Sequence, residues 1–336
     1  MNAPLRLITA AVSTTLLFTT FGSAAWAADA NAPRITFDGA IRNNSLALSP
    51  DERMAVVSYS ERPDVIAYDL QSSTVRGTLR TFITPRNIVF SPDGKVFYVS
   101  DSSLGEVVKI DSATLKTLSI LSEGAGAFGT ALSKDGGMLY VNNQAASTVT
   151  RFDTVSERAR AVIPGFAQPR QRVRLSPDGS KVYVTNFLGD KVTIVDSKTD
   201  KIDGEIVGFN KIRAISVTAD GKTMFAANSG SNTVAVVDIA DRKVTSTIPV
   251  GKDPYGAALT PDGRYVYVGN LADNTVSVID VATLKVVATI PGFKQPRQAI
   301  VFTRDGKTAY VLNEDLSVSK VDRSTQQIVA TIAASK

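Results

Sequence analysis

The segment from Ser176 to Asn186, SPDGSKVYVTN, decides the fold because close copies of it return along most of the chain. Its first four residues are typical of a turn: Ser opens it, Pro fixes φ, Asp bonds locally and Gly accepts a positive φ. The turn aspartates follow one another at steps of 42 or 43 residues, at Asp51, Asp93, Asp135, Asp178, Asp220, Asp262 and Asp305. A repeat of this length is typical of propellers and solenoids.

Each turn is followed by segments that have the character of strands. A large apolar or aromatic residue lies within the strand, five positions after each turn aspartate, at Val56, Tyr98, Tyr140, Tyr183, Phe225, Tyr267 and Tyr310. The last segment of a repeat is β-branched and alternating, as in Lys243 to Ile248, and no stretch has helical periodicity. We therefore predict an all-β fold: one seven-bladed β-propeller over residues 28–336, with four antiparallel strands per blade and the aromatic positions buried between blades.

Two segments compete to close the ring. Residues 34–37, Arg-Ile-Thr-Phe, could add the outer strand of the last blade, but residues 327–332 also have the pattern of that strand. The sequence leaves the choice open.

Residues 1–27 have the features of a cleaved signal peptide. One basic residue, Arg6, precedes an apolar stretch from Leu7 to Gly22, and Ala25-Trp26-Ala27 fits a small-x-small cleavage site. A mature chain starting at Ala28 would retain 36 of the 37 basic residues against 32 acidic ones, a net charge of +4, with no integral membrane segment. We expect a periplasmic or secreted protein.

Composition restricts the chemistry. The chain contains no Cys and no His, which excludes disulfides, thiolate nucleophiles, imidazole bases and histidine metal ligands. We see no calcium-loop or phosphate-loop pattern and predict no catalytic residue, no cofactor and no metal site.

The strand after the turn also carries a resemblance. Tyr183-Val184-Thr185-Asn186 is the signature of the YVTN-repeat propellers, which include the YncE-like periplasmic proteins, and residues 140–143 and 267–270 are close variants. The resemblance covers nearly all of the mature chain and implies the propeller fold. For some members it also implies binding of single-stranded DNA.

Arginine recurs in the loops that lead into the first strand of each repeat, here called inlet loops. In a propeller these loops share one face with the loops between second and third strands, and ligands favour loops carried by a rigid scaffold. Five of the seven inlet loops carry Arg near the start of the inner strand. The candidate ligand-binding residues are Arg42, Arg86, Arg170, Arg172, Arg213, Tyr255 and Arg297.

Converging guanidinium groups repel one another, so they either bind an anion or are neutralised by nearby acids. The acids available on the same face are Asp101, Glu106, Asp190, Asp273, Glu314 and Asp315. Nearby aromatic residues either form a stacking surface for bases or fill gaps between blades, the second being favoured by their repeat position. These aromatic residues are Phe82, Phe166, Phe209, Tyr255 and Phe293.

Three functions remain open. The leading hypothesis is a non-catalytic periplasmic binding module whose basic channel face recognises an anionic ligand or an acidic protein partner. The first alternative is binding of single-stranded DNA, for which the small net charge gives weak support. The second is a lactonase-type metal-dependent hydrolase, suggested by fold analogy alone.

Overall fold

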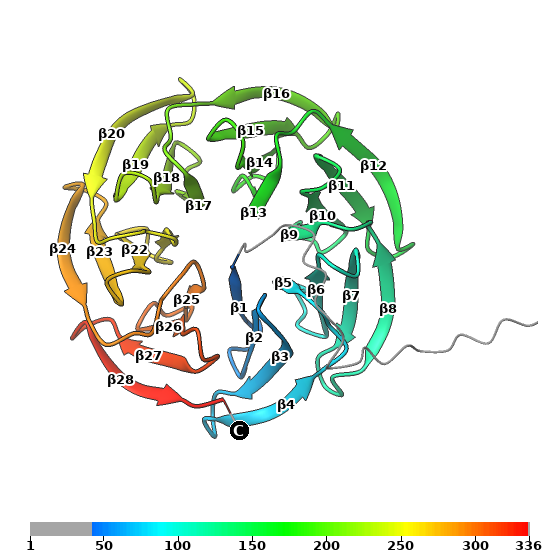
Figure 1. Cartoon of the computed structure of the whole chain (residues 1–336), viewed down its shortest axis with the longest axis horizontal. Helices are drawn as coiled ribbons and strands as arrows, with labels where there is room; N and C mark the ends of the chain where they lie inside the picture. Colours follow the sequence, from blue (N-terminus) through cyan, green and yellow to red (C-terminus); the bar gives the residue numbers. More distant parts are fainter. Residues whose placement is uncertain (1–41, 335–336) are drawn as a thin grey trace, which may run out of the picture.

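The computed structural model describes residues 42–334 and confirms the predicted propeller. Seven four-stranded antiparallel sheets surround a central axis (Figure 1), and the part of the chain described contains strands and turns but no helix. The expected signal peptide and the strand-like residues 34–37 lie outside the described residues.

The blades follow one another along the chain. Blade 1 contains β1 (Asn44–Leu48), β2 (Met54–Tyr59), β3 (Arg62–Asp69) and β4 (Thr74–Leu79); blade 2 contains β5 (Pro85–Phe90), β6 (Val96–Asp101), β7 (Glu106–Asp111) and β8 (Thr117–Ser122). Blade 3 contains β9 (Ala127–Leu132), β10 (Met138–Asn143), β11 (Thr148–Asp153) and β12 (Arg158–Pro164); blade 4 contains β13 (Pro169–Leu175), β14 (Lys181–Asn186), β15 (Lys191–Asp196) and β16 (Lys201–Ile206).

The remaining three blades have the same order. Blade 5 contains β17 (Ile212–Val217), β18 (Thr223–Asn228), β19 (Thr233–Asp238) and β20 (Lys243–Pro249). Blade 6 contains β21 (Ala258–Leu259), β22 (Tyr265–Asn270), β23 (Thr275–Asp280) and β24 (Lys285–Ile290), and blade 7 contains β25 (Ile300–Phe302), β26 (Thr308–Leu312), β27 (Val318–Asp322) and β28 (Gln327–Ile332).

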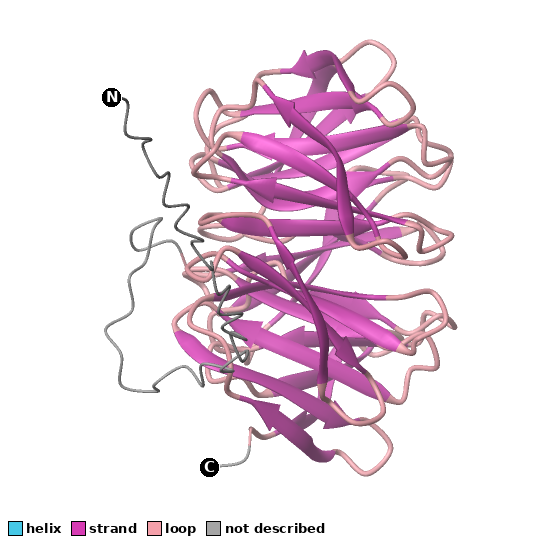
Figure 2. Cartoon of the chain, turned by 90° about the vertical axis from the view of Figure 1, so that its right-hand side faces the viewer, coloured by secondary structure: helices cyan, strands magenta, loops and turns pink. Residues whose placement is uncertain are grey.

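The strands run between two faces of loops (Figure 2). The inlet face carries the inlet loops and the loops between second and third strands, because the start of an inner strand pairs with the end of the second, as Asn44 does with Tyr59. The opposite face, here called the turn face, carries the repeated turns. In these turns the Ser91 hydroxyl donates to Asp93 at 2.7 Å and Gly94 has a φ of 71°. The predicted turn chemistry is confirmed.

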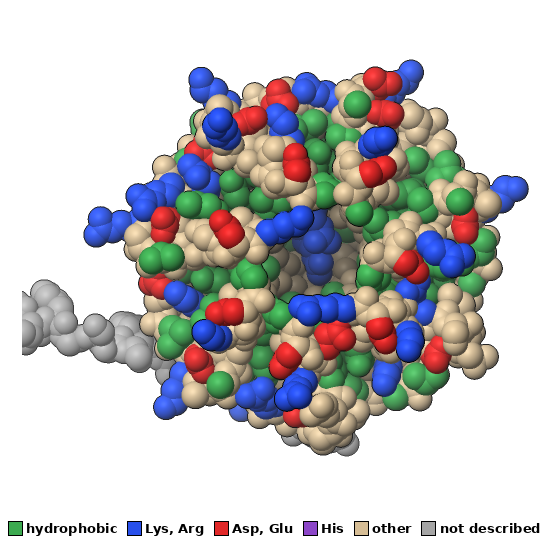
Figure 3. Space-filling model, turned by 180° about the vertical axis from the view of Figure 1, so that it is seen from behind, with side chains coloured by type: hydrophobic (Ala, Val, Ile, Leu, Met, Phe, Trp, Pro, Cys, Tyr) green, Lys and Arg blue, Asp and Glu red, His purple; other side chains and the backbone are tan. Residues whose placement is uncertain are grey.

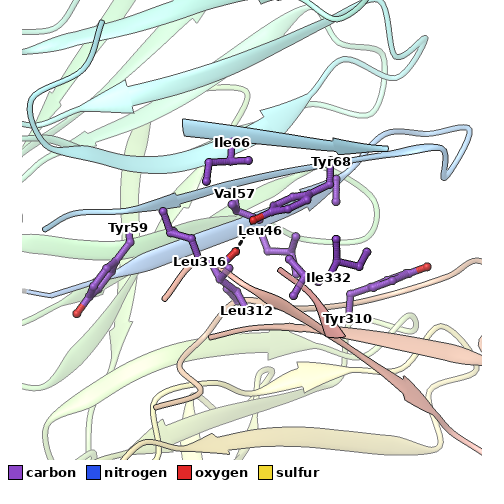
Figure 4. Packing of buried hydrophobic residues seen from close by; sticks show 12 residues of the cluster. Leu46, Val57, Tyr59, Ile66, Tyr68, Tyr310, Leu312, Leu316 and Ile332 are labelled. Carbon is purple, nitrogen blue, oxygen red and sulfur yellow. Dashed lines mark hydrogen bonds between the residues drawn. The ribbon is translucent and has the colours of Figure 1, made fainter. Parts of the chain in front are cut away.

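Ring closure uses the C-terminal segment. Strand β28 pairs with β27 as the outer strand of blade 7, so each described blade is one continuous piece of chain. A buried cluster joins blade 1 to blade 7, with Leu46 and Tyr68 on one side and Leu312 and Leu316 on the other (Figure 4). The Tyr68 hydroxyl donates to the Leu316 carbonyl oxygen at 2.6 Å across this boundary.

The core consists of similar clusters between successive blades. The predicted aromatic positions are buried, with Phe225 and Tyr267 at 0% exposure. Among the residues that could have stacked on bases, Phe82, Phe166 and Phe293 are buried in these clusters and Phe209 packs against one of them. They fill gaps between blades, as their repeat position indicated.

Two blades contain an additional residue in the inlet loop. In blade 4 the inner strand advances four residues, from Pro169 to Val173, while its partner strand advances two, from Asn186 to Val184. In blade 5 the inner strand advances only three residues, from Ile212 to Ile215, over the equivalent two residues of its partner. Blade 7 has the same extra length, which explains the two 43-residue steps that end at Asp178 and Asp305. We call these segments the blade 4 bulge (residues 168–172) and the blade 7 bulge (residues 295–299).

Each bulge lies against a glycine of the preceding blade. A Cβ on Gly129 would lie 1.8 Å from the Gln171 carbonyl oxygen, and one on Gly256 would lie 2.7 Å from the Arg297 carbonyl oxygen. A side chain at either glycine would therefore collide with backbone. The two glycines occupy the same repeat position, six residues before the turn aspartate.

Candidate anion-binding channel

Arg86 is the most buried of the predicted binding residues. Its side chain is 0% exposed, Nε donates to Ser102 Oγ at 2.8 Å, and a terminal nitrogen donates to Asn43 Oδ1 at 3.0 Å. The guanidinium also lies 4.6 Å from the centroid of the Phe128 ring. Since Asn43 precedes β1 and Phe128 lies on β9, Arg86 joins three consecutive blades.

Tyr255 connects three of the other predicted residues. Arg213 and Arg297 lie 4.6 and 5.0 Å from the centroid of its ring, and its hydroxyl donates to the Arg42 carbonyl oxygen at 3.2 Å. Arg297, which is 3% exposed, also donates to that carbonyl and lies 5.8 Å from the centroid of Tyr59. The guanidinium of Arg42 is exposed and forms an ion pair with Glu61 at 2.7 Å. Tyr255 and Arg297 thus hold blades 1, 5, 6 and 7 together at the inlet face.

Arg170 is partly exposed in the blade 4 bulge. Its guanidinium stacks on Phe187, 3.7 Å from the ring centroid, and donates to Gln168 Oε1 at 3.2 Å. With its amide oriented so that oxygen faces the guanidinium, Gln144 accepts from Nε and a terminal nitrogen at 3.0 and 2.9 Å. These contacts hold the side chain in place while leaving part of it accessible.

Several acids expected to neutralise these arginines instead hold the inlet loops. Asp101 accepts hydrogen bonds from the backbone N–H groups of Ile83 and Thr84 at 2.7 and 2.8 Å. Asp190 and Asp273 accept from inlet-loop N–H groups of blades 5 and 6 at 3.2 and 2.6 Å. Asp315 pairs at 2.6 Å with a lysine of the blade 7 inlet loop, Lys294.

A cavity of about 410 Å³ lies where the inner strands of blades 4 to 7 meet. Seen from the turn face, the molecule is hollowed at its centre, with Lys and Arg side chains in and around the hollow (Figure 3). Arg172 and Arg174 of β13 line this central cavity on one side, and no acidic residue is among its lining. The seven described inner strands likewise contain no Asp or Glu.

The two arginines of the central cavity have few partners. Arg174 Nε donates to the Ile215 carbonyl oxygen at 3.3 Å, whereas Arg172 Nε has no partner among residues 42–334, and neither side chain forms an ion pair there. Burial lowers the pKa of both guanidinium groups, and the charge of Arg174 lowers that of Arg172 further. The cavity wall therefore carries positive charge without a compensating carboxylate.

Arg174 and Ser216 are the residues that sequence reasoning missed. Ser216 lines the cavity from β17, is 7% exposed, and its hydroxyl has no partner within the described chain. The period-2 spacing of Arg170, Arg172 and Arg174 was a usable signal, since alternate residues of a strand share one side. Nothing in the sequence distinguished Ser216 from the many other serines of the repeats.

Among residues 42–334 there is no cluster of three or more acidic side chains placed to hold a metal ion. No helix in that range has the length and apolar character needed to cross a membrane.

Comparison with known families agrees with this architecture. Residues 217–336 match the family model of YNCE-like beta-propellers, and residues 44–205 match that of the seven-bladed beta-propeller lactonases. The expected resemblance to YncE-like propellers is therefore confirmed for the C-terminal part of the chain. No curated protein matches the sequence.

Among solved structures, the chain is similar to a chain of hydrazine synthase from Kuenenia stuttgartiensis. The TM-score is 0.77 at 20% sequence identity, and the similarity covers 83% of this chain and 95% of that one. At this identity the likeness concerns the fold alone.

Proposed function

We propose that this seven-bladed propeller of YNCE-like and lactonase-like type is a non-catalytic periplasmic binding module that takes up an anionic group in its channel. The observation that carries the proposal is the pair Arg172 and Arg174, which lines the central cavity without a carboxylate partner among the described residues. The anionic group belongs to a small molecule or to an acidic protein partner.

The energetics of the pair favour an anion. Two partly buried guanidinium groups lose hydration and repel each other, and a bound anion relieves both penalties while gaining charge-assisted hydrogen bonds. Arg170, on the same strand nearer the inlet face, extends the basic surface. Arg86 and Arg297 are buried in contacts between blades, so we assign them a role in holding the site in shape.

The two alternatives have less support. Binding of single-stranded DNA through stacking needs accessible rings, but the aromatic residues considered for it are mostly buried. The lactonase-like match concerns the fold, and we propose no hydrolytic function from it.

The test is calorimetric titration of the chain from Ala28 with inorganic phosphate, a short polyphosphate and a single-stranded oligonucleotide over a range of salt concentrations. We expect phosphate and polyphosphate to bind and the double variant Arg172→Gln/Arg174→Gln to bind at least tenfold more weakly, because each charge-assisted bond contributes about 1.5–3 kcal/mol.

The matched control is Lys95→Gln/Lys307→Gln, which removes the same charge from side chains that are 81% and 84% exposed. Equal loss in both double variants would show that only net charge matters and would refute a channel site. Binding of the oligonucleotide alone would favour the DNA alternative.

A further inference from the structure

The central cavity has two chemically different walls, and from them we infer the class of ligand: a small organic acid with an apolar body, whose carboxylate binds Arg172 and Arg174. This inference rests on the proposed function and makes its ligand specific.

The basic wall suits a carboxylate. Planar guanidinium groups bind carboxylates through paired hydrogen bonds. Arg172 Nε has no partner within residues 42–334, and Arg174 uses its Nε on a backbone carbonyl, which leaves its terminal nitrogens for a ligand. One carboxylate between the two side chains would neutralise part of the repulsion between them.

The opposite wall is apolar. It is formed by the inner strands of blades 6 and 7, where Leu259, Ile300, Val301 and Phe302 line the cavity. Phe302 is fixed by an edge-on contact with Tyr267, their ring centroids being 5.1 Å apart. A hydrated inorganic anion leaves this wall in contact with water, whereas a ligand with an alkyl or aryl body covers it and gains the free energy of burying apolar surface.

Ser216 lies on β17 of blade 5 and also lines the cavity. Blade 5 follows the blade that carries the two arginines and precedes the two blades that form the apolar wall. Its hydroxyl is buried without a partner in the described chain, and an unpaired buried polar group costs free energy unless a ligand satisfies it. A carboxylate oxygen would accept this hydrogen bond. The volume of about 410 Å³ falls within the range of small-molecule sites.

The experiment is calorimetric titration of the chain from Ala28 with acetate, butyrate, hexanoate, octanoate, hexanol and inorganic phosphate. We expect affinity to rise about fourfold for each methylene added to the carboxylate, in line with the transfer free energy of a buried methylene. Hexanol should bind at least tenfold more weakly than hexanoate, because it lacks the charge.

Three variants measure what each wall contributes to binding. Arg172→Gln should weaken every carboxylate at least tenfold, and Ser216→Ala should weaken each by about fivefold. Val301→Ser should reduce the gain in affinity for each methylene added to the carboxylate. Circular dichroism and thermal unfolding of each variant establish that the propeller is intact.

The outcomes separate this inference from the proposed function. If phosphate and acetate bind equally and longer tails add nothing, the ligand class is wrong while the anion site stands. If hexanol binds as tightly as hexanoate, or Arg172→Gln has no effect on hexanoate, the two-walled site is refuted. If none of the probes binds, both proposals fail.

Discussion

The blade 4 and blade 7 bulges begin with the same four residues, Gln-Pro-Arg-Gln, and yet their surroundings differ. In blade 7 the amide nitrogen of Gln298 donates to the Asn44 carbonyl oxygen at 3.1 Å, and Arg297 is enclosed by tyrosines. In blade 4 Gln171 has a φ of 65°, and both polar atoms of its side chain lack a partner in the described chain. Both bulges contain buried atoms without a partner in the described chain, and these include Arg297 Nε and Gln298 Oε1 in blade 7. The difference lies at the second glutamine, which has a positive φ and no side-chain hydrogen bond in blade 4 but has a hydrogen bond and no positive φ in blade 7.

The difference teaches where this repeat fold has room for a ligand. Non-glycine residues held at positive φ persist where the surrounding structure fixes them, and they cluster at functional sites. After the shared four residues, blade 4 continues with Arg172 and blade 7 with the buried Ala299. The same insertion therefore supports the ring in one place and lines a basic cavity in the other.

The largest effect should come from the glycines that accommodate the bulges. Gly129→Ala places a Cβ against the Gln171 carbonyl and should lower the free energy of unfolding by about 3 kcal/mol or more, with Gly256→Ala costing less. Urea denaturation monitored by circular dichroism measures both. Gly137→Ala, whose nearest contact would be an ordinary 3.5 Å, is the control and should change little. Equal stability of the Gly129→Ala and Gly137→Ala variants would show that the blade 4 bulge moves freely.

Glu123, a partly buried acid outside the bulges, shows how much a carboxylate without a basic partner in the described chain lowers the stability of this fold. Burial raises the pKa of Glu123 to about 8, although Thr150 donates to it at 3.0 Å. The folded chain therefore binds this proton at a pH where the unfolded chain has released it, so Glu123 lowers stability increasingly as pH rises from about 4.5 to about 8.

Urea denaturation at pH 5, 6 and 7.5 tests this expectation against Glu123→Gln. The stability of the variant relative to the native chain should rise by about 1 kcal/mol per pH unit, since one proton is involved. A pH-independent difference would mean that the carboxyl titrates normally.

The arginines of the two bulges should differ in their contribution to stability. Arg297→Met removes contacts to two tyrosines and to the Arg42 carbonyl and should cost about 2 kcal/mol. Arg170→Met, at the partly exposed equivalent position, should cost less than about 1 kcal/mol. The comparison of the two bulges would be wrong if the order of these costs in urea denaturation were reversed.

The smallest effect should appear at the second glutamine of each bulge. Gln171→Gly relieves a left-handed conformation and removes an unsatisfied side chain, so we expect a gain of up to about 1 kcal/mol. Gln298→Gly removes the hydrogen bond to Asn44 and should cost about 1 kcal/mol. Differential scanning calorimetry measures whether each variant is more or less stable than the native chain. A loss of stability in both variants would contradict the argument for strain in blade 4.

The sequence predicted the fold well because the information was local and repeated. Each turn, from Ser49-Pro50-Asp51 onward, contains the residues that end one strand and begin the next. Seven such turns at nearly constant spacing indicate a propeller with seven blades. The closing strand was undecided because residues 34–37 and 327–332 have equivalent patterns, and pairing with β27 depends on packing that only the closed ring provides.

The site was predicted less completely because its contacts cross blade boundaries. Arg86 had the same sequence pattern as Arg170, but its burial follows from Asn43 and Phe128, about one repeat away on either side. The central cavity combines β13 with the inner strands of blades 5 to 7, and no local pattern reports how such strands converge. The two 43-residue steps marked both bulges, but they did not indicate which of the two would line the cavity.

The continuity of each described blade has a consequence for the way the ring can open. Successive blades are joined by the peptide chain, but within residues 42–334 the boundary between blades 7 and 1 is held by side-chain packing and by hydrogen bonds such as that from Tyr68 to Leu316. Among these described residues, parting the boundary between blades 7 and 1 breaks no covalent bond and no strand pairing. The sheets of these two blades are therefore separate from one another at this boundary, and its strength depends on side-chain packing and on a few hydrogen bonds.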